Sequence, residues 1–503
     1  MTTATSTQQA GSSTALPRES RSIIVTLLVA AFVVILNETI MGVALPRLMI
    51  DLGITARTVQ WLTTAFMLTM AVVIPTTGFL LQRLSTRTVF MLAMGLFCTG
   101  TLLAAVSPGF WLLLPARVVQ ASGTAMMIPL LMTTVLTLVP IEQRGVVMGN
   151  ISIAISVAPA IGPTVSGLIL QFLSWRFMFV LVLPVALAAM IYGSRRLVNV
   201  GQHGNQKLDI VSVLLSVPAF GGIVFGLSRL GQGSSGPAVA LGFVAVGVAC
   251  LLVFGWRQLR LIRKGSPLLD LRAFRYPMFS LSLTLLCLAM LSLFGMVILL
   301  PIYLQTIRSI GSLSTGLILL PGGLLMGLLG PTVGKLFDRY GPRGLTILGA
   351  SLLGLTMWQL SMVDTETPVW MLVGLHVVLS VGLACLFTPC FTTALNPLPP
   401  YLYSHGSAIL ATLQQVAGAA GTALLVAIMS GSSLKLAQSG ASPAAALNGG
   451  INAAFTVAAV ISIGALICAF FMRNAKAPVT EAPLTETAVE NGSEARTNVS
   501  ESL

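Results

Sequence analysis

The feature that most constrains this chain is a series of long apolar runs joined by short polar connections. Each run comes close to the roughly 20 residues that a helix needs to cross the hydrocarbon core of a membrane. Charged residues make up only 8% of the chain, against about 25% in soluble domains. We therefore predict an all-α polytopic membrane protein with 14 transmembrane helices. The runs lie at about 22–45, 58–81, 88–106, 110–138, 145–171, 175–193, 209–230, 236–256, 278–304, 313–337, 344–362, 368–394, 406–430 and 450–472.

An internal repeat groups these runs into two related sets. The segment GFLLQRLSTR from Gly78 aligns with GKLFDRYGPR from Gly334, and WLLLPARVVQASGTA from Trp111 aligns with WMLVGLHVVLSVGLA from Trp370. Matching runs are eight apart rather than six, so two runs are inserted between two halves of six. The expected regions are a disordered tail at 1–20, a six-helix bundle at 21–196, a linker with two inserted helices at 197–264, a second six-helix bundle at 265–473 and a second disordered tail at 474–503.

The basic residues indicate how the chain lies in the membrane. If both termini are cytoplasmic, the inner loops and tails carry twenty Lys and Arg residues and the outer loops carry six. Because positive residues accumulate on the cytoplasmic side, this bias predicts a multi-pass protein of the inner or plasma membrane with both termini in the cytoplasm. The net charge of +13 is spread over short loops without interleaved aromatic residues, which argues against a nucleic-acid partner.

Ionisable groups inside membrane spans are costly and therefore mark functional candidates. Among the fourteen acidic residues only Glu38 falls inside a run, and Arg117 falls at a similar depth in the fourth run. Pairing of the two, directly or through water, would let Glu38 bind and release a proton during transport. Static roles stay open for both residues: Glu38 could be a hydrogen-bonded carboxyl group that holds its helix in place, and Arg117 could be a structural cation that binds backbone carbonyls. His376, which aligns with Arg117, is a second titratable candidate or a packing residue.

The two aligned loops are candidates for a gate on the cytoplasmic side. Asp338 suits the positive end of the helix that follows it, and the neighbouring arginines could pair with it. Glycines in and beside the loops allow helices to approach closely. A charged turn that merely obeys the positive-inside rule is the alternative. The gate candidates are Gly78, Arg83 and Arg87 at the first loop and Gly334, Asp338, Arg339, Gly341 and Arg343 at the second.

The fifth run and several polar side chains complete the candidate site. The segment SVAPAIGPTVSGLI contains Pro159, Gly162, Pro163 and Gly167, which predict a bent and closely packed helix, or a kink without a further role. Polar residues inside other runs could line a substrate cavity or could bond to a neighbouring helix. These cavity candidates are Asn37, Gln60, Thr64, Gln120, Gln414 and Gln415.

The sequence contains no signature of an enzyme or of a bound cofactor. It has no Walker loop, no Gly-rich strand–helix turn and no HExxH motif. The three histidines are too dispersed for a metal cluster, and the six cysteines lack CxxC spacing. We therefore expect no enzyme activity, no cofactor and no metal, and we expect transport to be driven by a gradient rather than by nucleotide hydrolysis.

These motifs resemble the major facilitator superfamily and, within it, the fourteen-span drug:proton antiporter branch. GKLFDRYGPR is similar to the superfamily's loop between the second and third helices of a half, and GFLLQRLSTR to a degenerate copy without the Asp and the Gly. LNETIMGVALP, ARVVQASGTA and AIGPTVSG resemble the branch's motifs in spans 1, 4 and 5, and FLLQRLSTR also resembles lincomycin-export permeases. The resemblance covers about residues 20–472. It implies the major facilitator fold, with Glu38 at an acidic position of the family and Arg117 in proton coupling.

The expected function is proton-coupled efflux of lipophilic or amphipathic small molecules by alternating access. The expected partners are a small-molecule substrate, protons and the lipid bilayer, and nothing in the sequence supports a periplasmic adaptor. Because Glu38 is the single acidic residue inside a run, we expect few protons per cycle and a preference for neutral or monocationic substrates over dications. The alternatives are a dedicated exporter or proton symporter of one metabolite, and a membrane sensor that does not transport.

Overall fold

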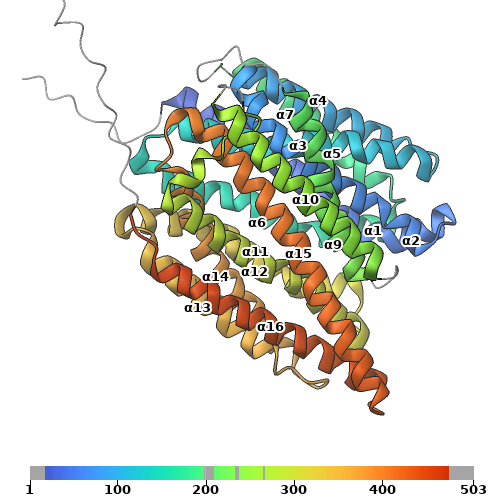
Figure 1. Ribbon diagram of the computed structural model, residues 1–503. Coiled ribbons are helices and arrows are strands. Elements are labelled where there is room, and N and C mark those ends of the chain that lie inside the picture. Colours follow the sequence, from blue (N-terminus) through green and yellow to red (C-terminus); the bar gives the residue numbers. More distant parts are fainter. Residues whose placement is uncertain (1–16, 198, 200–208, 233–236, 264–266, 475–503) are drawn as a thin grey trace, which may run out of the picture.

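The computed structural model describes residues 17–197, 199, 209–232, 237–263 and 267–474. These ranges fold into helices joined by short connections (Figure 1). The main helices are α1 (Arg18–Leu52), α2 (Ala56–Val59), α3 (Trp61–Arg83), α4 (Thr86–Ala105), α5 (Phe110–Leu138), α6 (Arg144–Phe172), α7 (Phe177–Arg196), α8 (Ile210–Ser216), α9 (Gly222–Gln232), α10 (Pro237–Ile262), α11 (Pro277–Ile302), α12 (Ser312–Tyr340), α13 (Pro342–Leu360), α14 (Val369–Leu395), α15 (Tyr403–Gln438) and α16 (Pro443–Phe470).

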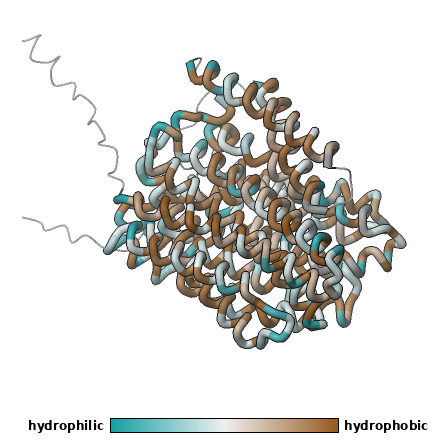
Figure 2. The backbone as a smooth tube through the Cα atoms, turned by 60° about the horizontal axis from the view of Figure 1, so that its bottom comes forward, coloured by the Kyte–Doolittle hydropathy of each residue, from teal (hydrophilic) through white to brown (hydrophobic). Residues whose placement is uncertain are grey.

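The described part of the chain contains thirteen helical stretches that are long and apolar enough to cross a membrane. Figure 2 shows hydrophobic segments through the middle of the molecule and hydrophilic ones mainly near the helix ends. The chain is therefore a multi-pass membrane protein, but the predicted count of fourteen is not confirmed. The predicted run at 344–362 forms α13, which packs against α14 and α16. It is not among the thirteen, and the polar residues Arg343 and Gln359 near its ends lower its mean hydropathy.

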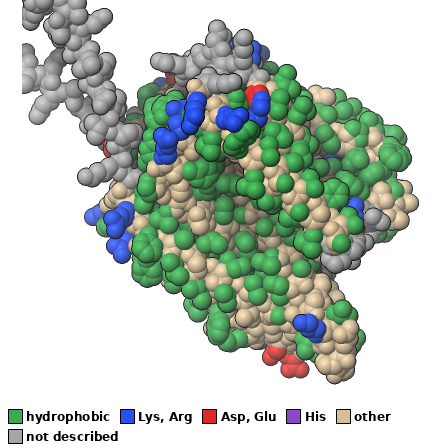
Figure 3. Space-filling view, in the orientation of Figure 1, with side chains coloured by type: hydrophobic (Ala, Val, Ile, Leu, Met, Phe, Trp, Pro, Cys, Tyr) green, Lys and Arg blue, Asp and Glu red, His purple; other side chains and the backbone are tan. Residues whose placement is uncertain are grey.

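Short connections make successive long helices antiparallel, so their ends gather at two opposite ends of the molecule. One of these ends carries Arg83, Arg196, Arg257 and Arg339 near the ends of α3, α7, α10 and α12, and we call it the basic end. The helices α4, α6, α11, α13 and α15 begin there. Figure 3 shows many of the visible Lys and Arg side chains along the upper left of the molecule, while the broad face in view is mostly hydrophobic.

Two seams join the earlier helices to the later ones. At the first seam α6 packs along α12, and at the second α3 and α5 pack on α15. The inserted helix α9 lies against α15 and also contacts α3 beside the second seam. The division into two six-helix bundles stays a prediction. α1 begins at Arg18, three residues before the expected boundary at residue 21, and the rest of the expected tails lies mainly outside the described residues, at 1–16 and 475–503.

The inserted helices are fastened at the basic end. Asp209 precedes α8 and accepts hydrogen bonds at 2.7 Å from Nε and Nη2 of Arg257 near the end of α10. The hydrogen bond from this guanidinium group, above all, holds the pKa of Asp209 down to about 2. The side chain of Gln258 accepts hydrogen bonds from the backbone N–H groups of Leu268 and Leu269. This contact ties the inserted helices to the segment that leads into α11.

Candidate functional site

Arg117 lies within α5 and joins three helices through its guanidinium group. Its side chain is 1% exposed. Nη1 donates to Gln120 Oε1 one turn further along α5, at 2.5 Å, and to Asn37 Oδ1 of α1 at 3.4 Å. The guanidinium carbon lies 4.0 Å from the ring centroid of Phe66 on α3. A buried cation held between amide oxygens and an aromatic face is fixed in position while it keeps its charge.

Gln120 is itself held by α4. Its Nε2 donates to Thr101 Oγ1 at 2.7 Å, and that hydroxyl donates in turn to the backbone oxygen of Phe97. Because the hydroxyl proton of Thr101 is already used, its oxygen must accept from the amide, and the Oε1 of Gln120 must face Arg117. Asn37 and Gln120 are 2% and 0% exposed. They bond to neighbouring side chains here, and their role in lining a cavity stays a prediction.

Glu38 follows Asn37 on α1 and has a partly exposed side chain. Direct pairing with Arg117 is not present: among the described residues, no ion pair within 4.0 Å and no side-chain hydrogen bond involves Glu38. Glu38 is therefore not held by a bonded partner among the described residues, and its part in proton coupling stays a prediction.

His376 lies on α14, and its ring packs against α12 at Gly322, where an added methyl group would collide with it. The ring is partly buried, and its Nδ1 has no hydrogen-bond partner among the described residues. No hydrogen bond or ion pair that we observe connects it with Arg117 or Glu38. Among the described residues, these three candidates are therefore not joined into one hydrogen-bonded network.

Asp338 reaches across the first seam. Its two carboxylate oxygens accept hydrogen bonds at 3.0 Å from the backbone N–H groups of Gly145 and Val146, which lie in the first turn of α6. Asp338 therefore caps α6, and the sequence-based expectation that it serves the following helix was wrong. The side chains of Arg339 and Arg343 are exposed and form no ion pair with Asp338 in the described part of the chain.

Gln82, which aligns with Asp338 in the repeat, reaches across the second seam. Its Nε2 donates to the backbone oxygen of Tyr401, just before α15, at 2.9 Å. The nearby Arg83 and Arg87 are exposed. In the other loop Gly341 takes φ of 79° between α12 and α13, a conformation that glycine adopts without strain.

Glycines set the distance between α6 and α12 at the basic end. An added methyl group at Gly334 would collide with the carbonyl oxygen of Gly145, and one at Gly149 with that of Gly330. At these glycines the two backbones therefore contact each other directly. At Gly78 on the second seam an added methyl group would meet His405 Nδ1 at 3.2 Å and the side chain of Ala408 at 3.3 Å.

The remaining candidates are distributed over several helices. α6 runs without interruption through Pro159 and Pro163, Gly162 packs against Thr39 of α1, and Gly167 lies beside Leu313 of α12. Gln60 immediately precedes α3, so it lies at the end of the span rather than inside it. The other cavity candidates, Thr64, Gln414 and Gln415, are partly or largely buried within α3 and α15.

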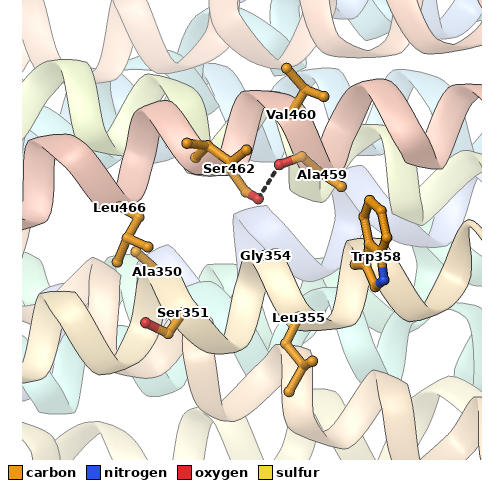
Figure 4. Close-up of a pocket in the computed structure, with 10 residues that line it drawn as sticks. Ala350, Ser351, Gly354, Leu355, Trp358, Ala459, Val460, Ser462 and Leu466 are labelled. Atoms are coloured by element: carbon orange, nitrogen blue, oxygen red, sulfur yellow. Dashed lines mark hydrogen bonds between the residues drawn. The ribbon is translucent and has the colours of Figure 1, made fainter.

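A groove on the outer surface lies away from all of these residues. It has a volume of about 340 Å³ and is formed by α13 and α16. Figure 4 shows Trp358 and Leu355 at one part of it and the small residues Gly354 and Ala459 between the helices, where Ser462 Oγ donates to the Ala459 carbonyl. Its lining is almost entirely apolar and includes none of the predicted site residues.

A bundle of apolar helices with a buried cation and with contacts across two seams has the architecture of a membrane transporter. Residues 27–422 match the family model of the Major Facilitator Superfamily, and the chain belongs to this family. The predicted all-α major facilitator fold is thereby confirmed, without the count of fourteen helices. The family and its relatives point to a transporter and not to an enzyme.

Similar proteins agree with this assignment. The lincomycin resistance protein LmrB of Listeria monocytogenes is 42% identical over 460 residues, which cover 90% of this chain and 97% of that protein. LmrB of Bacillus subtilis is 40% identical over 463 residues, covering 90% and 96%. The crystal structure of the human organic anion transporter MFSD10 shares the fold with a TM-score of 0.64 at 16% identity, and it covers 90% of this chain and all of that chain.

Proposed function

We propose that this protein exports lipophilic or amphipathic small molecules in exchange for protons, by alternating access between two helical bundles. The observation that carries the proposal is the similarity to lincomycin resistance proteins along nearly their whole length. A more distant relative from Mycobacterium tuberculosis, 29% identical over 78% of this chain, is named a multidrug resistance protein B homolog. The substrates that we propose are therefore antibiotics and related drugs of neutral or monocationic charge.

Proton exchange is proposed for Glu38. It is the single acidic residue in the predicted first span, and the described residues leave its carboxyl group without a hydrogen-bonded partner. Arg117 is fixed by Gln120, Asn37 and Phe66, so its charge acts on Glu38 from a constant position. A change in access or hydration around Glu38 would then be sufficient to shift its protonation as the bundles move.

The orientation and the gate belong to the same proposal. The positive-inside rule places the basic end in the cytoplasm of the cell, with the protein in the inner or plasma membrane. Asp338 and Gln82 bridge the two seams at this end, which supports a conformation closed toward the cytoplasm. Release of these contacts would open the basic end to a substrate that enters from the cytoplasm or from the inner leaflet.

The test is to replace Glu38 by Gln, which keeps the shape and removes the exchangeable charge. In a host without its own drug pumps, we expect Glu38→Gln to abolish export against a gradient, and in everted vesicles to abolish the drug-induced loss of the pH gradient. Glu142→Gln changes an exposed acid beside the start of α6 and is the matched control. Unchanged uphill export by Glu38→Gln at normal protein levels would refute proton exchange through Glu38.

A further inference from the structure

Arg144, at the basic end, is a cation buried without an acidic partner. It is the first residue of α6, and its side chain is 5% exposed. The ion pairs within 4.0 Å in the described ranges are Arg47–Asp51, Arg257–Asp209 and Arg272–Asp270, and none involves Arg144. A charge withdrawn from water is costly unless other polar groups replace the water. The groups around this guanidinium therefore indicate what it does.

Part of the guanidinium group binds the end of α5, on its own side of the seam. Its Nη2 donates to the carbonyl oxygen of Leu136 at 2.6 Å, and its Nε donates to that of Val139 at 3.1 Å. The Leu136 carbonyl would normally accept from the N–H group four residues further on, but residue 140 is proline and has none. The negative end of the α5 dipole also favours a cation here.

The rest of the guanidinium group reaches the later helices. Nη1 donates to Asn396 Oδ1 at 3.2 Å, and Nη2 donates to the hydroxyl of Tyr403 at 3.2 Å. Asn396 directly follows α14, which is the counterpart of α5 in the internal repeat, and Tyr403 begins α15. The same cation thus lies at the negative ends of two equivalent helices, one from each set.

We propose that Arg144 is a gate residue that holds the basic end closed, and that it acts through helix ends and a hydroxyl group rather than through an ion pair. This inference rests on the alternating access proposed above. When the seams open at this end, Arg144 keeps Leu136 and Val139 and loses Asn396 and Tyr403. The lost hydrogen bonds and the exposed negative end of α14 favour return to the closed state, whereas the bonds to α5 keep the cation satisfied in both states.

The experiment measures opening at the basic end directly. Ser407 on α15 is 2% exposed, and its hydroxyl lies 2.9 Å from that of Thr133 on α5. In a variant whose six native cysteines are replaced, Ser407→Cys is labelled in everted vesicles with a membrane-impermeant maleimide. Adding Arg144→Gln should raise the labelling rate roughly tenfold, because a charge-assisted contact is lost. Arg144→Lys should give an intermediate rate, since one ammonium group cannot reach four acceptors spread around it.

Two further variants keep the proposal falsifiable. Asn396→Ala removes one of the two acceptors across the seam and leaves the contacts with Tyr403 and with α5, so it should raise labelling about threefold even if Arg144→Gln fails to reach the membrane. Arg176→Gln is the matched control, because Arg176 also donates to a backbone carbonyl, that of Ser107, but lies at the opposite end. It should leave labelling unchanged. Labelling at the parental rate in both Arg144→Gln and Asn396→Ala would overturn the proposal.

Exchanging the charges of Arg144 and Asp338 distinguishes the proposed gate from one that depends on an ion pair between these two residues. If Arg144 and Asp338 formed an ion pair in any state of the cycle, the double variant Arg144→Asp with Asp338→Arg would restore slow labelling. We expect it to label faster than either single variant, because each reversed charge then faces a helix end of the same sign. Restored slow labelling would refute the mechanism. The assay needs neither substrate nor a pH gradient, so its outcome is independent of whether Glu38 exchanges protons.

Discussion

The two seams are equivalent in the internal repeat but are built in different ways. Along α6–α12, glycines bring the two backbones into contact, and the charged Asp338 caps the first turn of α6. Along α3–α15, Gly78 leaves more room, because an added methyl group would meet His405, Ala408 and the carbonyl oxygen of Ser404 only at 3.2–3.3 Å, and a neutral Gln82 donates to a single carbonyl. Of the two seams, the first therefore combines a charged contact with close approach of the helix backbones. We infer that the first seam is the stiff one and that the second can yield.

The largest difference between the seams should follow from added methyl groups. Gly149→Ala places a methyl group against the carbonyl oxygen of Gly330, a rigid backbone atom, so the two helices must separate. Overpacking of this kind costs about 1–3 kcal/mol, and we expect drug export to fall more than tenfold. Gly78→Ala meets its neighbours at 3.2–3.3 Å, and export should fall at most about threefold.

Initial rates of export in everted vesicles, normalised to the amount of protein in the membrane, compare the two glycine variants. Gly95→Ala on α4 is the control, because an added methyl group there has no neighbour within 4 Å. Equal losses in Gly149→Ala and Gly78→Ala would show that both seams are equally stiff, and the comparison would fail.

Removal of the charge at the first seam should have the next largest effect. Asp338→Asn keeps an oxygen that can accept one of the two backbone hydrogen bonds, but it loses the charge at the positive end of α6. We expect about fivefold slower export and faster maleimide labelling of Ser407→Cys. Asp338→Glu should recover part of the loss, whereas an unchanged labelling rate in Asp338→Asn would contradict a closing role for the carboxylate.

The sequence predicted more of the fold than of the contacts between helices. The apolar runs located the membrane helices because a helix in lipid needs a long apolar stretch. α13 is the exception, since its polar ends keep it out of the thirteen helical stretches that are apolar enough to cross a membrane. The repeat aligned Gln82 with Asp338, and both do reach across a seam. Local sequence could not reveal that Asp338 caps α6, because that helix lies almost two hundred residues earlier in the chain.

Arg144 and Thr101 make contacts that could not be predicted from the sequence alone. Arg144 counted only as one more positive charge of an inner loop, although the proline four residues after Leu136 is a signal that a carbonyl at the end of α5 needs another donor. Thr101 lies in an apolar run and looks like an ordinary helix residue. Only its position across from Gln120 shows that it orients the amide that binds Arg117.

The neutral contact at the second seam should have a smaller effect than the charged one. Gln82→Ala removes one hydrogen bond to the Tyr401 carbonyl, and export should fall only about twofold. Gln82→Asp should be worse than Gln82→Ala, since a carboxylate cannot donate to this carbonyl and would face its oxygen. The same vesicle assay ranks the two variants, and a loss in Gln82→Ala as large as that in Asp338→Asn would erase the distinction between the seams.

The smallest effects should come from two hydroxyl pairs that lie deeper between the two sets of helices. Ser152 on α6 lies 2.8 Å from Thr388 on α14, and Thr133 on α5 lies 2.9 Å from Ser407 on α15, measured between hydroxyl oxygens. The hydroxyls of Ser152 and Ser407 also have a backbone acceptor in their own helix. Thr388→Val and Thr133→Val each remove one partner, and the hydroxyl groups that remain, those of Ser152 and Ser407, keep their backbone acceptors.

We therefore expect both hydroxyl variants to keep at least about half of the parental export rate, with nearly equal losses. Equal losses would locate the asymmetry in the outermost turns of the basic end, where Asp338 and Gln82 lie, rather than along the whole length of the seams. A markedly larger loss in Thr388→Val than in Thr133→Val, measured at matched protein levels, would instead extend the stiffness of α6 by two further turns, to Ser152, toward the middle of the membrane.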